Sequence, residues 1–186
     1  IARLDMNFLY EIGCPTLKIP AVWKAPALEM PVIPEKVDYC KSILELISDL
    51  NLCSREYKSR MYDGEVKGLS VVKPFVGVLA DIPSDATVMR VSYNSDRGVI
   101  LAEGINPWYS DIDTYAMTTS VIDEAVRRII SVGGDLERIA ILDNFCWPDP
   151  VESNKTPDGK YKMAQLVRSC EALYDLTTLY KTPAIS

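Results

Sequence analysis

Two regions in the carboxyl-terminal half of the chain carry apolar residues at the spacing of a long α-helix. The stripe nearer the carboxyl end contains Met163, Leu166, Val167, Cys170, Leu173, Tyr174 and Thr177. Pro183 follows it at the distance expected beyond a helix end. The other stripe contains Met117, Val121, Ile122, Ala125, Ile129 and Ile130. Ser110-x-x-Asp113 precedes it as a capping box, and Gly133-Gly134 follows as a stop signal. The pattern therefore predicts two long amphipathic helices.

Shorter apolar runs predict strands. Three of them cover 69–80, 86–94 and 98–105, and the segments between them have loop and hairpin composition. A fourth run, 138–143, ends abruptly in Asp143-Asn144 and is followed by a loop over 145–159. It predicts a buried strand whose polar end opens onto a pocket.

The amino-terminal part has a different character. Alternation of polar and apolar residues predicts a strand over 1–9, and five prolines between 15 and 34 then exclude a long helix or a central strand. We expect a linker or an arm that lies over another surface, because Leu17, Val22 and Trp23 need cover. A helix is predicted over 35–52 and a short one over 54–60. The apolar stripe of the longer helix contains Cys40, Ile43, Leu44, Ile47 and Leu50.

The order of these elements predicts an α+β fold. Antiparallel strands come first, and a helix, a strand and a helix follow, which describes a two-layer domain with a mostly antiparallel sheet and helices on one face. Apolar residues occupy both phases of 69–80. We therefore expect a second sheet to cover the other face.

Composition excludes several classes of function. The net charge of the 186 residues is −6 and no cluster of Lys or Arg stands out, which argues against nucleic acid or an anionic membrane as a partner. The chain contains no histidine, so Ser-His-Asp and Cys-His nucleophiles and HExxH metal sites are excluded. The five cysteines are scattered and lack CxxC spacing, which is typical of free thiols in a reducing cytoplasm.

Short motifs in a fixed order add a resemblance to a known family. They are Tyr62-Asp63, Glu65-Val66, Gly68 and Lys73-Pro74, then Pro83-Ser84-Asp85-Ala86, then Asn106-Pro-Trp-Tyr109 with Asp113-x-Tyr115, then Ile122-Asp-Glu124-Ala125, and finally 139–150. Their order and spacing resemble the synthetase subunit of phosphoribosylformylglycinamidine synthase. The match is to the amino-terminal domain of the second of its two tandem halves.

The resemblance implies a fold and a domain organisation. The fold is that of the amino-terminal domain of aminoimidazole ribonucleotide synthase, in which the sheets of two related halves pack together into a barrel. Residues 1–53 are expected to hold the end strand of the preceding half, the linker and one helix, and 54–186 the α+β domain. We expect the chain to be a fragment of a longer polypeptide.

The resemblance also implies an activity. In this family ATP activates the formamide oxygen of formylglycinamide ribonucleotide, and ammonia from glutamine then attacks the formamide carbon to give the amidine. The complete enzyme requires ATP and Mg²⁺ and works in the cytoplasm. The implied partners are the other half of the synthetase and a glutaminase, and a homodimer through the sheet face is a further expectation.

This chain is expected to be structural within that enzyme, completing the barrel and the wall of the cleft. The family's catalytic half carries histidines in a Glu-x-His-Asn-His-Pro motif, whereas the corresponding segment here is Glu103-Gly-Ile-Asn106-Pro107. We therefore expect no catalytic residue in this chain, no activity when it is isolated, and no bound cofactor.

Several side chains remain candidates for ligand contact. The pocket candidates are Asp143, Asn144, Asn106, Tyr109, Lys73 and Asp63. The structural alternatives are a capped turn for Asp143-Asn144, a buried aromatic corner for Tyr109 and a solvated edge for Lys73. Next to Asp63, Gly64 replaces the family's histidine. Asp111 and Asp113 could also offer oxygen ligands, although helix capping is the favoured role of Asp113.

Glu103 and Glu124 are candidates for an auxiliary Mg²⁺–nucleotide site. Longer family members place a Glu and an Asn or Asp four residues apart on this helix, and this chain has Arg128 at the later position. A guanidinium cannot ligate a cation, so a degraded site is expected. Two other functions stay open: another ATP-dependent synthetase or kinase of the same superfamily, and a non-catalytic interaction or dimerisation module that reuses the fold.

Overall fold

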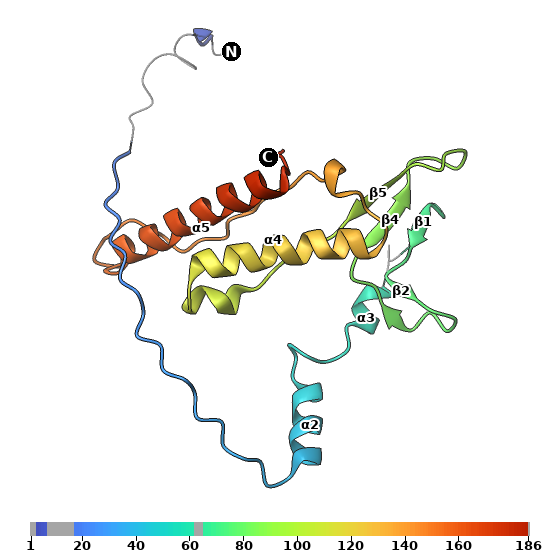
Figure 1. Cartoon of the computed structure of the whole chain (residues 1–186), viewed down its shortest axis with the longest axis horizontal. Coiled ribbons are helices and arrows are strands. Elements are labelled where there is room, and N and C mark those ends of the chain that lie inside the picture. Colours follow the sequence, from blue (N-terminus) through green and yellow to red (C-terminus); the bar gives the residue numbers. More distant parts are fainter. Residues whose placement is uncertain (1–2, 7–16, 62–64, 186) are drawn as a thin grey trace.

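The computed structural model describes residues 3–6, 17–61 and 65–185. A pair of long helices, α4 (Thr114–Ser131) and α5 (Gly159–Tyr180), lies side by side, and the strands gather beyond one end of α4 (Figure 1). Both helices were predicted, and both lie where the helical stripes placed them.

Small side chains form the contact between α4 and α5. The buried residues of α4 are Thr114, Thr118, Ile122 and Val126, which recur every fourth residue and so share one face. On α5 the buried residues are Gly159, Ala164, Ser169 and Ala172. Small residues let the two backbones approach closely, and Thr118 and Ser169 share a hydrogen bond of 2.5 Å between their hydroxyl oxygens. The apolar core lies beyond this contact and consists of Ile122, Val126 and Ile139, packed against Ile129, Ile141, Leu173, Leu176 and Tyr180.

The start of α4 differs from the expected capping box. Asp113 is the N-cap, because its carboxylate accepts a hydrogen bond of 2.9 Å from the backbone N–H of Tyr115. The Ser110 hydroxyl instead donates to the Pro107 carbonyl within the short helix η1 (Pro107–Asp111). At the other end, Gly133 adopts a φ of 90° and Gly134 N–H donates to the Ile129 carbonyl. The predicted glycine stop is thus confirmed.

The strands form two small antiparallel sheets. One has the order β1 (Ser70–Val72), β4 (Thr87–Arg90), β5 (Gly98–Leu101), and the other pairs β2 (Phe75–Val76) with β3 (Ile82–Pro83). The prediction of a single strand over 69–80 was wrong. Lys73-Pro74 separates β1 from β2, and Pro74 has no N–H to continue a ladder.

The predicted strand over 138–143 was also wrong in extent. Its first residue, Arg138, belongs to the short helix η2 (Leu136–Arg138), and Ile141 alone forms an isolated parallel bridge, with Ala184. Ile141 N–H donates to the Pro183 carbonyl, and Ile185 N–H donates to the Ile141 carbonyl. The chain after α5 therefore returns beside this segment.

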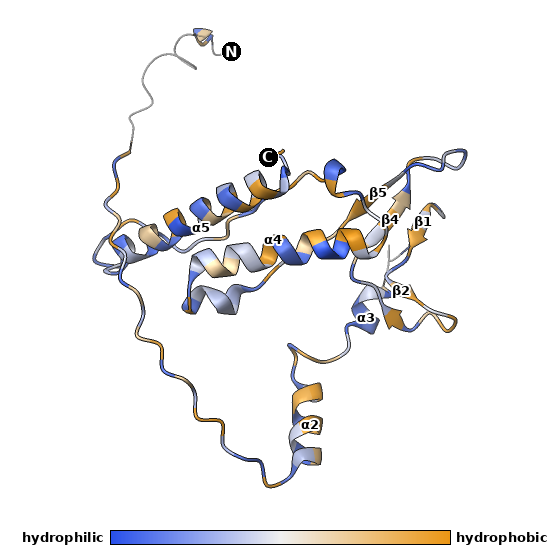
Figure 2. Cartoon of the chain, in the orientation of Figure 1, coloured by the Kyte–Doolittle hydropathy of each residue, from blue (hydrophilic) through white to orange (hydrophobic). Residues whose placement is uncertain are grey.

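The described part of the amino-terminal half includes the helices α2 (Tyr39–Ser48) and α3 (Glu56–Ser59). Asp38 caps α2 by accepting from the Lys41 N–H at 3.0 Å. No residue of α2 is buried, and the helix, whose apolar residues are orange in Figure 2, stands away from α4 and α5 (Figure 1). Its apolar residues Ile43, Leu44 and Ile47 are exposed. The expected helix over 35–52 is thus present but shorter.

The preceding arm, 17–38, has no regular secondary structure. As expected, it reaches another surface, because Val22 N–H donates to the Lys160 carbonyl of α5 at 3.0 Å. Trp23 is half-buried there, whereas Leu17 and Val22 remain exposed. The expected strand over 1–9 lies largely outside the described residues, and residues 3–6 form no strand.

These elements form an α+β structure with a small antiparallel sheet and helices, as predicted. Within the described ranges, no helix has both the length and the apolar character needed to cross a membrane. Cys40, Cys53, Cys146 and Cys170 are free thiols, and Cys14 lies outside the described residues.

Candidate functional site

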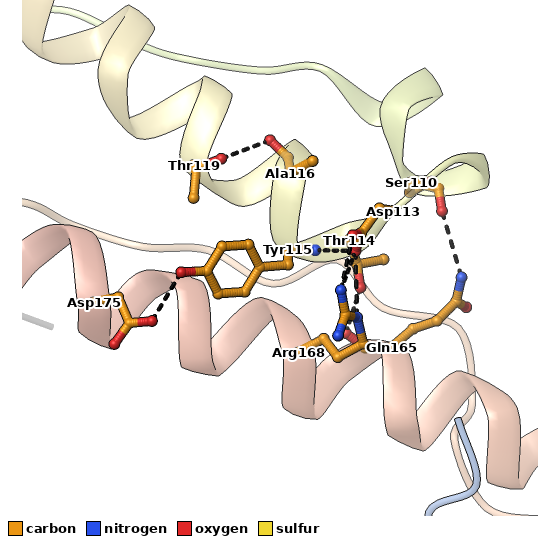
Figure 3. A network of polar contacts seen from close by, with 9 residues as sticks. All are labelled: Ser110, Asp113, Thr114, Tyr115, Ala116, Thr119, Gln165, Arg168 and Asp175. Carbon is orange, nitrogen blue, oxygen red and sulfur yellow. Dashed lines mark hydrogen bonds and ion pairs between the residues drawn. The ribbon is translucent and has the colours of Figure 1, made fainter. Parts of the chain in front are cut away.

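A network of polar contacts joins the start of α4 to the middle of α5 (Figure 3). Its centre is an ion pair in which Arg168 Nη2 donates to both carboxylate oxygens of Asp113, at 2.9 and 2.7 Å, while Nε lies 3.3 Å from Oδ1. Both side chains are about two-thirds buried, with exposed fractions of 28% for Arg168 and 32% for Asp113. A charge-assisted pair with several hydrogen bonds fixes the relative orientation of its partners.

The environment of Asp113 stabilises its charged form. Burial by itself would raise the pKa of this carboxyl, but the hydrogen bonds from Arg168 and from the Tyr115 N–H lower the pKa below its usual value of 3.8. Asp113 thus remains ionised at neutral pH. Its charge is already matched by Arg168 and by the helix it caps.

Aromatic rings surround the Arg168 guanidinium. The Trp23 ring centroid lies 4.4 Å from its central carbon, and the Tyr115 centroid lies at 5.9 Å. Trp23 also stacks on Tyr161 with a centroid distance of 5.5 Å and an interplanar angle of 9°. The guanidinium therefore combines an ion pair with cation–π contacts.

Further hydrogen bonds connect α4 and α5 around this centre. The Thr114 hydroxyl donates to the Gln165 carbonyl at 2.8 Å, and the Tyr115 hydroxyl donates to Asp175 at 2.8 Å. The bond to Asp175, followed by burial, raises the pKa of Tyr115 above 10.0. Each of these groups already has a partner within the chain. The network accordingly holds the two helices together.

A second polar cluster contains the two metal-ligand candidates. Glu124 and Arg128 on α4 form an ion pair of 2.6 Å, and Arg128 Nη1 donates to the backbone carbonyl of Glu103 at 2.9 Å. The guanidinium therefore contacts an oxygen of each candidate residue. Within the described ranges, no three His, Cys, Asp or Glu side chains are grouped so that they could hold a metal ion.

A close backbone contact places Glu103 beside α4. The neighbouring Gly104 lies against the turn at Val121, where an added Cβ would be 1.9 Å from the Val121 carbonyl oxygen. Only glycine allows this approach. The segment that follows β5 therefore runs along the helix instead of continuing the expected strand to residue 105.

The remaining pocket candidates are distributed over several elements. Asn106 precedes η1 and makes no side-chain cap, while Tyr109 within η1 is exposed. Lys73 pairs with Glu65 at 2.9 Å on the surface beside β1. Asp63 lies outside the described residues.

Asp143 and Asn144 lie on the loop that follows the Ile141 bridge. Asp143 is half-exposed and Asn144 is exposed. Burial, then the charges of Asp143 and Glu171, raise the pKa of the Cys170 thiol above 9.0, which places Asp143 near α5. Trp147 holds the same loop on α5 by donating from Nε1 to the Lys162 carbonyl at 3.1 Å.

Sequence reasoning did not identify Arg168 as a central residue. Arg168 follows Val167 but lies off the apolar stripe of this helix, so no signal in the sequence indicated that its guanidinium is half-buried. No local pattern indicates that the partner is Asp113, 55 residues earlier.

Comparison with known proteins shows similarity over almost the whole chain. The phosphoribosylformylglycinamidine synthase subunit PurL of Thermoplasma acidophilum is 29% identical over 184 residues, which are 98% of this chain and 23% of that protein. The PurL subunit of Picrophilus torridus is 31% identical over 150 residues, 80% of this chain and 19% of that protein. That of Methanocaldococcus jannaschii is 29% identical over 143 residues, 77% and 17% respectively.

The chain therefore spans about a quarter or less of the length of the curated relatives it matches. No family model matches it. No solved structure matches it either. The resemblance expected from the order of the motifs is confirmed by these relatives.

Proposed function

We propose that this chain, which corresponds in sequence to a section of phosphoribosylformylglycinamidine synthase subunit PurL, acts as a structural section of such a synthetase. The whole enzyme would convert formylglycinamide ribonucleotide, ATP and ammonia from glutamine into the amidine product. The similarity over 98% of the chain to a PurL subunit carries the proposal. Residues 54–186 would form the domain, and 1–53 the preceding strand, arm and helix.

A scaffolding role is supported by the state of the polar groups. Asp113 is paired with Arg168, and Tyr115 donates a hydrogen bond to Asp175. These polar groups are therefore engaged in joining α4 to α5. In the complete enzyme, Asp143, Asn144, Asn106 and Tyr109 would line the wall of the cleft, with Lys73 at its edge. The chemistry itself would occur in the other half.

The exposed face of the larger sheet supports pairing with a second sheet. Met89 faces Val99 across β4 and β5, and Thr87 faces Leu101, so these side chains share a face. Met89, Val99 and Leu101 are exposed apolar residues. Burying them against the sheet of the other half would complete the barrel, and in the isolated chain the same face would pair with a second copy.

Arg128 supports the loss of an auxiliary nucleotide site. Its guanidinium already supplies positive charge to Glu124 and to the Glu103 carbonyl. The complete enzyme would still use ATP and Mg²⁺ elsewhere, together with a glutaminase partner that delivers ammonia.

A section exchange tests the proposed function. The section of the Thermoplasma acidophilum subunit that aligns with this chain is replaced by this chain, and ADP release is measured with formylglycinamide ribonucleotide and ammonia. We expect the chimera to retain activity within roughly tenfold of the parent. The same subunit without the section is the control. A folded chimera as inactive as that control would contradict the proposal.

Titration calorimetry with ADP and Mg²⁺ tests the degraded site. We expect no heat of binding with the wild-type chain, because Arg128 occupies the contacts that a cation would make. The Arg128→Asn variant removes that charge and restores an amide oxygen, so a gain of binding is expected. Binding by the wild type would contradict the loss of the site.

A further inference from the structure

The arm contains a segment with the composition of a peptide ligand. It reads Ile19-Pro20-Ala21-Val22-Trp23-Lys24-Ala25-Pro26, with one tryptophan between two prolines. Proline fixes its own φ and restricts the preceding residue to extended conformations. Little conformational freedom is therefore lost when such a segment binds a surface.

Trp23 joins this segment to α5 through two ring contacts. Its ring stacks on Tyr161 and lies 4.4 Å from the Arg168 guanidinium carbon. Val22 N–H adds one backbone hydrogen bond of 3.0 Å to the Lys160 carbonyl. The side chains of Val22 and Lys24 are exposed, whereas those of Ile19, Trp23 and Pro26 are half-buried.

The surface that receives Trp23 is held in place by contacts that do not involve the arm. Asp113 binds the Arg168 guanidinium through both carboxylate oxygens and thereby fixes the plane of the group. Tyr161 lies in the first turns of α5. A rigid ring and a fixed guanidinium plane form a preorganised site for another aromatic ring.

We propose that Tyr161 and Arg168 form a docking site for a proline-flanked tryptophan segment, and that residues 19–26 are its ligand, bound in cis and detachable. Two ring contacts of Trp23 and one backbone hydrogen bond of Val22 join the segment to α5, which suits reversible docking. Docking fixes where the arm crosses α5, and therefore the direction from which the preceding residues approach the domain. This inference does not depend on the proposed enzymatic function.

Limited trypsin digestion of the full chain tests docking. Lys24 lies within the docked segment, and Lys36 lies further along the arm, so cleavage after Lys36 is an internal reference. Removing the stacking and cation–π contacts with Trp23→Ala should accelerate cleavage after Lys24 by roughly tenfold and leave Lys36 unchanged. The proposal would be overturned if Trp23→Ala accelerated cleavage equally after Lys24 and after Lys36, or accelerated neither.

Two variants of α5 locate the surface. Tyr161→Ala removes the stacking partner without touching the Asp113–Arg168 pair and should reproduce the effect of Trp23→Ala. Tyr174→Ala, on an exposed residue of the same helix, should leave the cleavage rates unchanged. If Tyr161→Ala left Lys24 protected, the assigned site would be wrong.

A peptide added in trans separates recognition from general stability. Two labelled peptides of residues 17–28 are compared, one with the natural sequence and one with alanine in place of tryptophan. The natural peptide should bind the Trp23→Ala chain at least tenfold more tightly than the alanine peptide does. It should bind the wild-type chain more weakly, because that chain's own segment occupies the site. Equal binding of both peptides would contradict the proposal.

Protection of Lys24 should not depend on chain concentration when docking occurs in cis. Protection that rises with concentration would show docking on a second copy, and would overturn the cis assignment.

Discussion

At the scale of single residues, Asp113 has two separable roles. Its Oδ1 atom caps α4 through the Tyr115 N–H, and both oxygens accept from Arg168 on α5. Asparagine is also a good N-cap but carries no charge. Substitution by asparagine or alanine therefore distinguishes the two contributions.

We expect Asp113→Asn to lower the free energy of unfolding by about 1–2 kcal/mol, through loss of a charge-assisted pair. Asp113→Ala should cost about 1 kcal/mol more, because the cap is lost as well. Urea denaturation of the three chains measures both differences. Equal stability of the asparagine variant and the wild type would show that the ion pair contributes nothing.

The same pair predicts a pH dependence. The pKa of Asp113 is lower in the folded chain than its usual value of 3.8, so folding favours the charged form. The contribution of the Asp113 charge to the free energy of unfolding is complete above the pKa of this group in the unfolded chain, about 4. It is lost as the pH falls through the lower pKa of the folded chain. The difference in unfolding free energy between the wild type and Asp113→Asn should therefore shrink as the pH falls below about 4. A constant difference would contradict this assignment.

Cys170 tests where Asp143 lies. Burial first, and then the charges of Asp143 and Glu171, raise the pKa of this thiol, which lowers the thiolate fraction at neutral pH. Iodoacetamide should therefore modify Cys170 slowly at neutral pH, and Cys40 on helix α2 serves as the reference thiol. Asp143→Asn should accelerate modification of Cys170 but not of Cys40, as measured by mass spectrometry. An unchanged rate at Cys170 would place Asp143 too far away to act.

At the scale of elements, the contact between the segment after β5 and helix α4 depends on Gly104. The Cβ of an alanine would lie 1.9 Å from the Val121 carbonyl oxygen, and backbone atoms cannot move aside cheaply. Gly104→Ala should therefore lower the free energy of unfolding by about 1–3 kcal/mol. The adjacent Glu103→Ala, on an exposed side chain, should change it by less than about 0.5 kcal/mol. Similar effects of both changes would contradict the close contact.

Elements could be predicted where the signal is local. Helices α4 and α5 were visible as apolar stripes with stop signals, because periodicity and capping depend on neighbouring residues. The strands were less well predicted. Pro74 splits one apolar run between two sheets, and the run ending at Asp143 pairs only at Ile141, since strand pairing depends on a partner elsewhere in the chain.

At the scale of the whole molecule, the exposed sheet face predicts association. Leu101 projects from β5 on the same face as Met89 and Val99. If a second copy covers this face, light scattering after gel filtration should detect a dimer. Leu101→Glu should dissociate it, because a buried unpaired carboxylate is costly. The matched change Tyr174→Glu, on exposed α5, should leave the dimer intact. A wild-type chain that stays monomeric at high concentration would contradict homodimer formation.

The sequence alone determined the α+β class, the two long helices, the absence of histidine chemistry and the resemblance to the synthase, because these follow from composition, periodicity and the order of short motifs. Only the tertiary structure decided that Arg168 pairs with Asp113, that Trp23 lies on Tyr161, and that Arg128 links Glu124 to the Glu103 backbone. The contacts between different elements join residues that are far apart in the sequence, from 25 positions for Arg128 and Glu103 to 138 positions for Trp23 and Tyr161. No local pattern carries that information, since it arises when whole faces pack against one another.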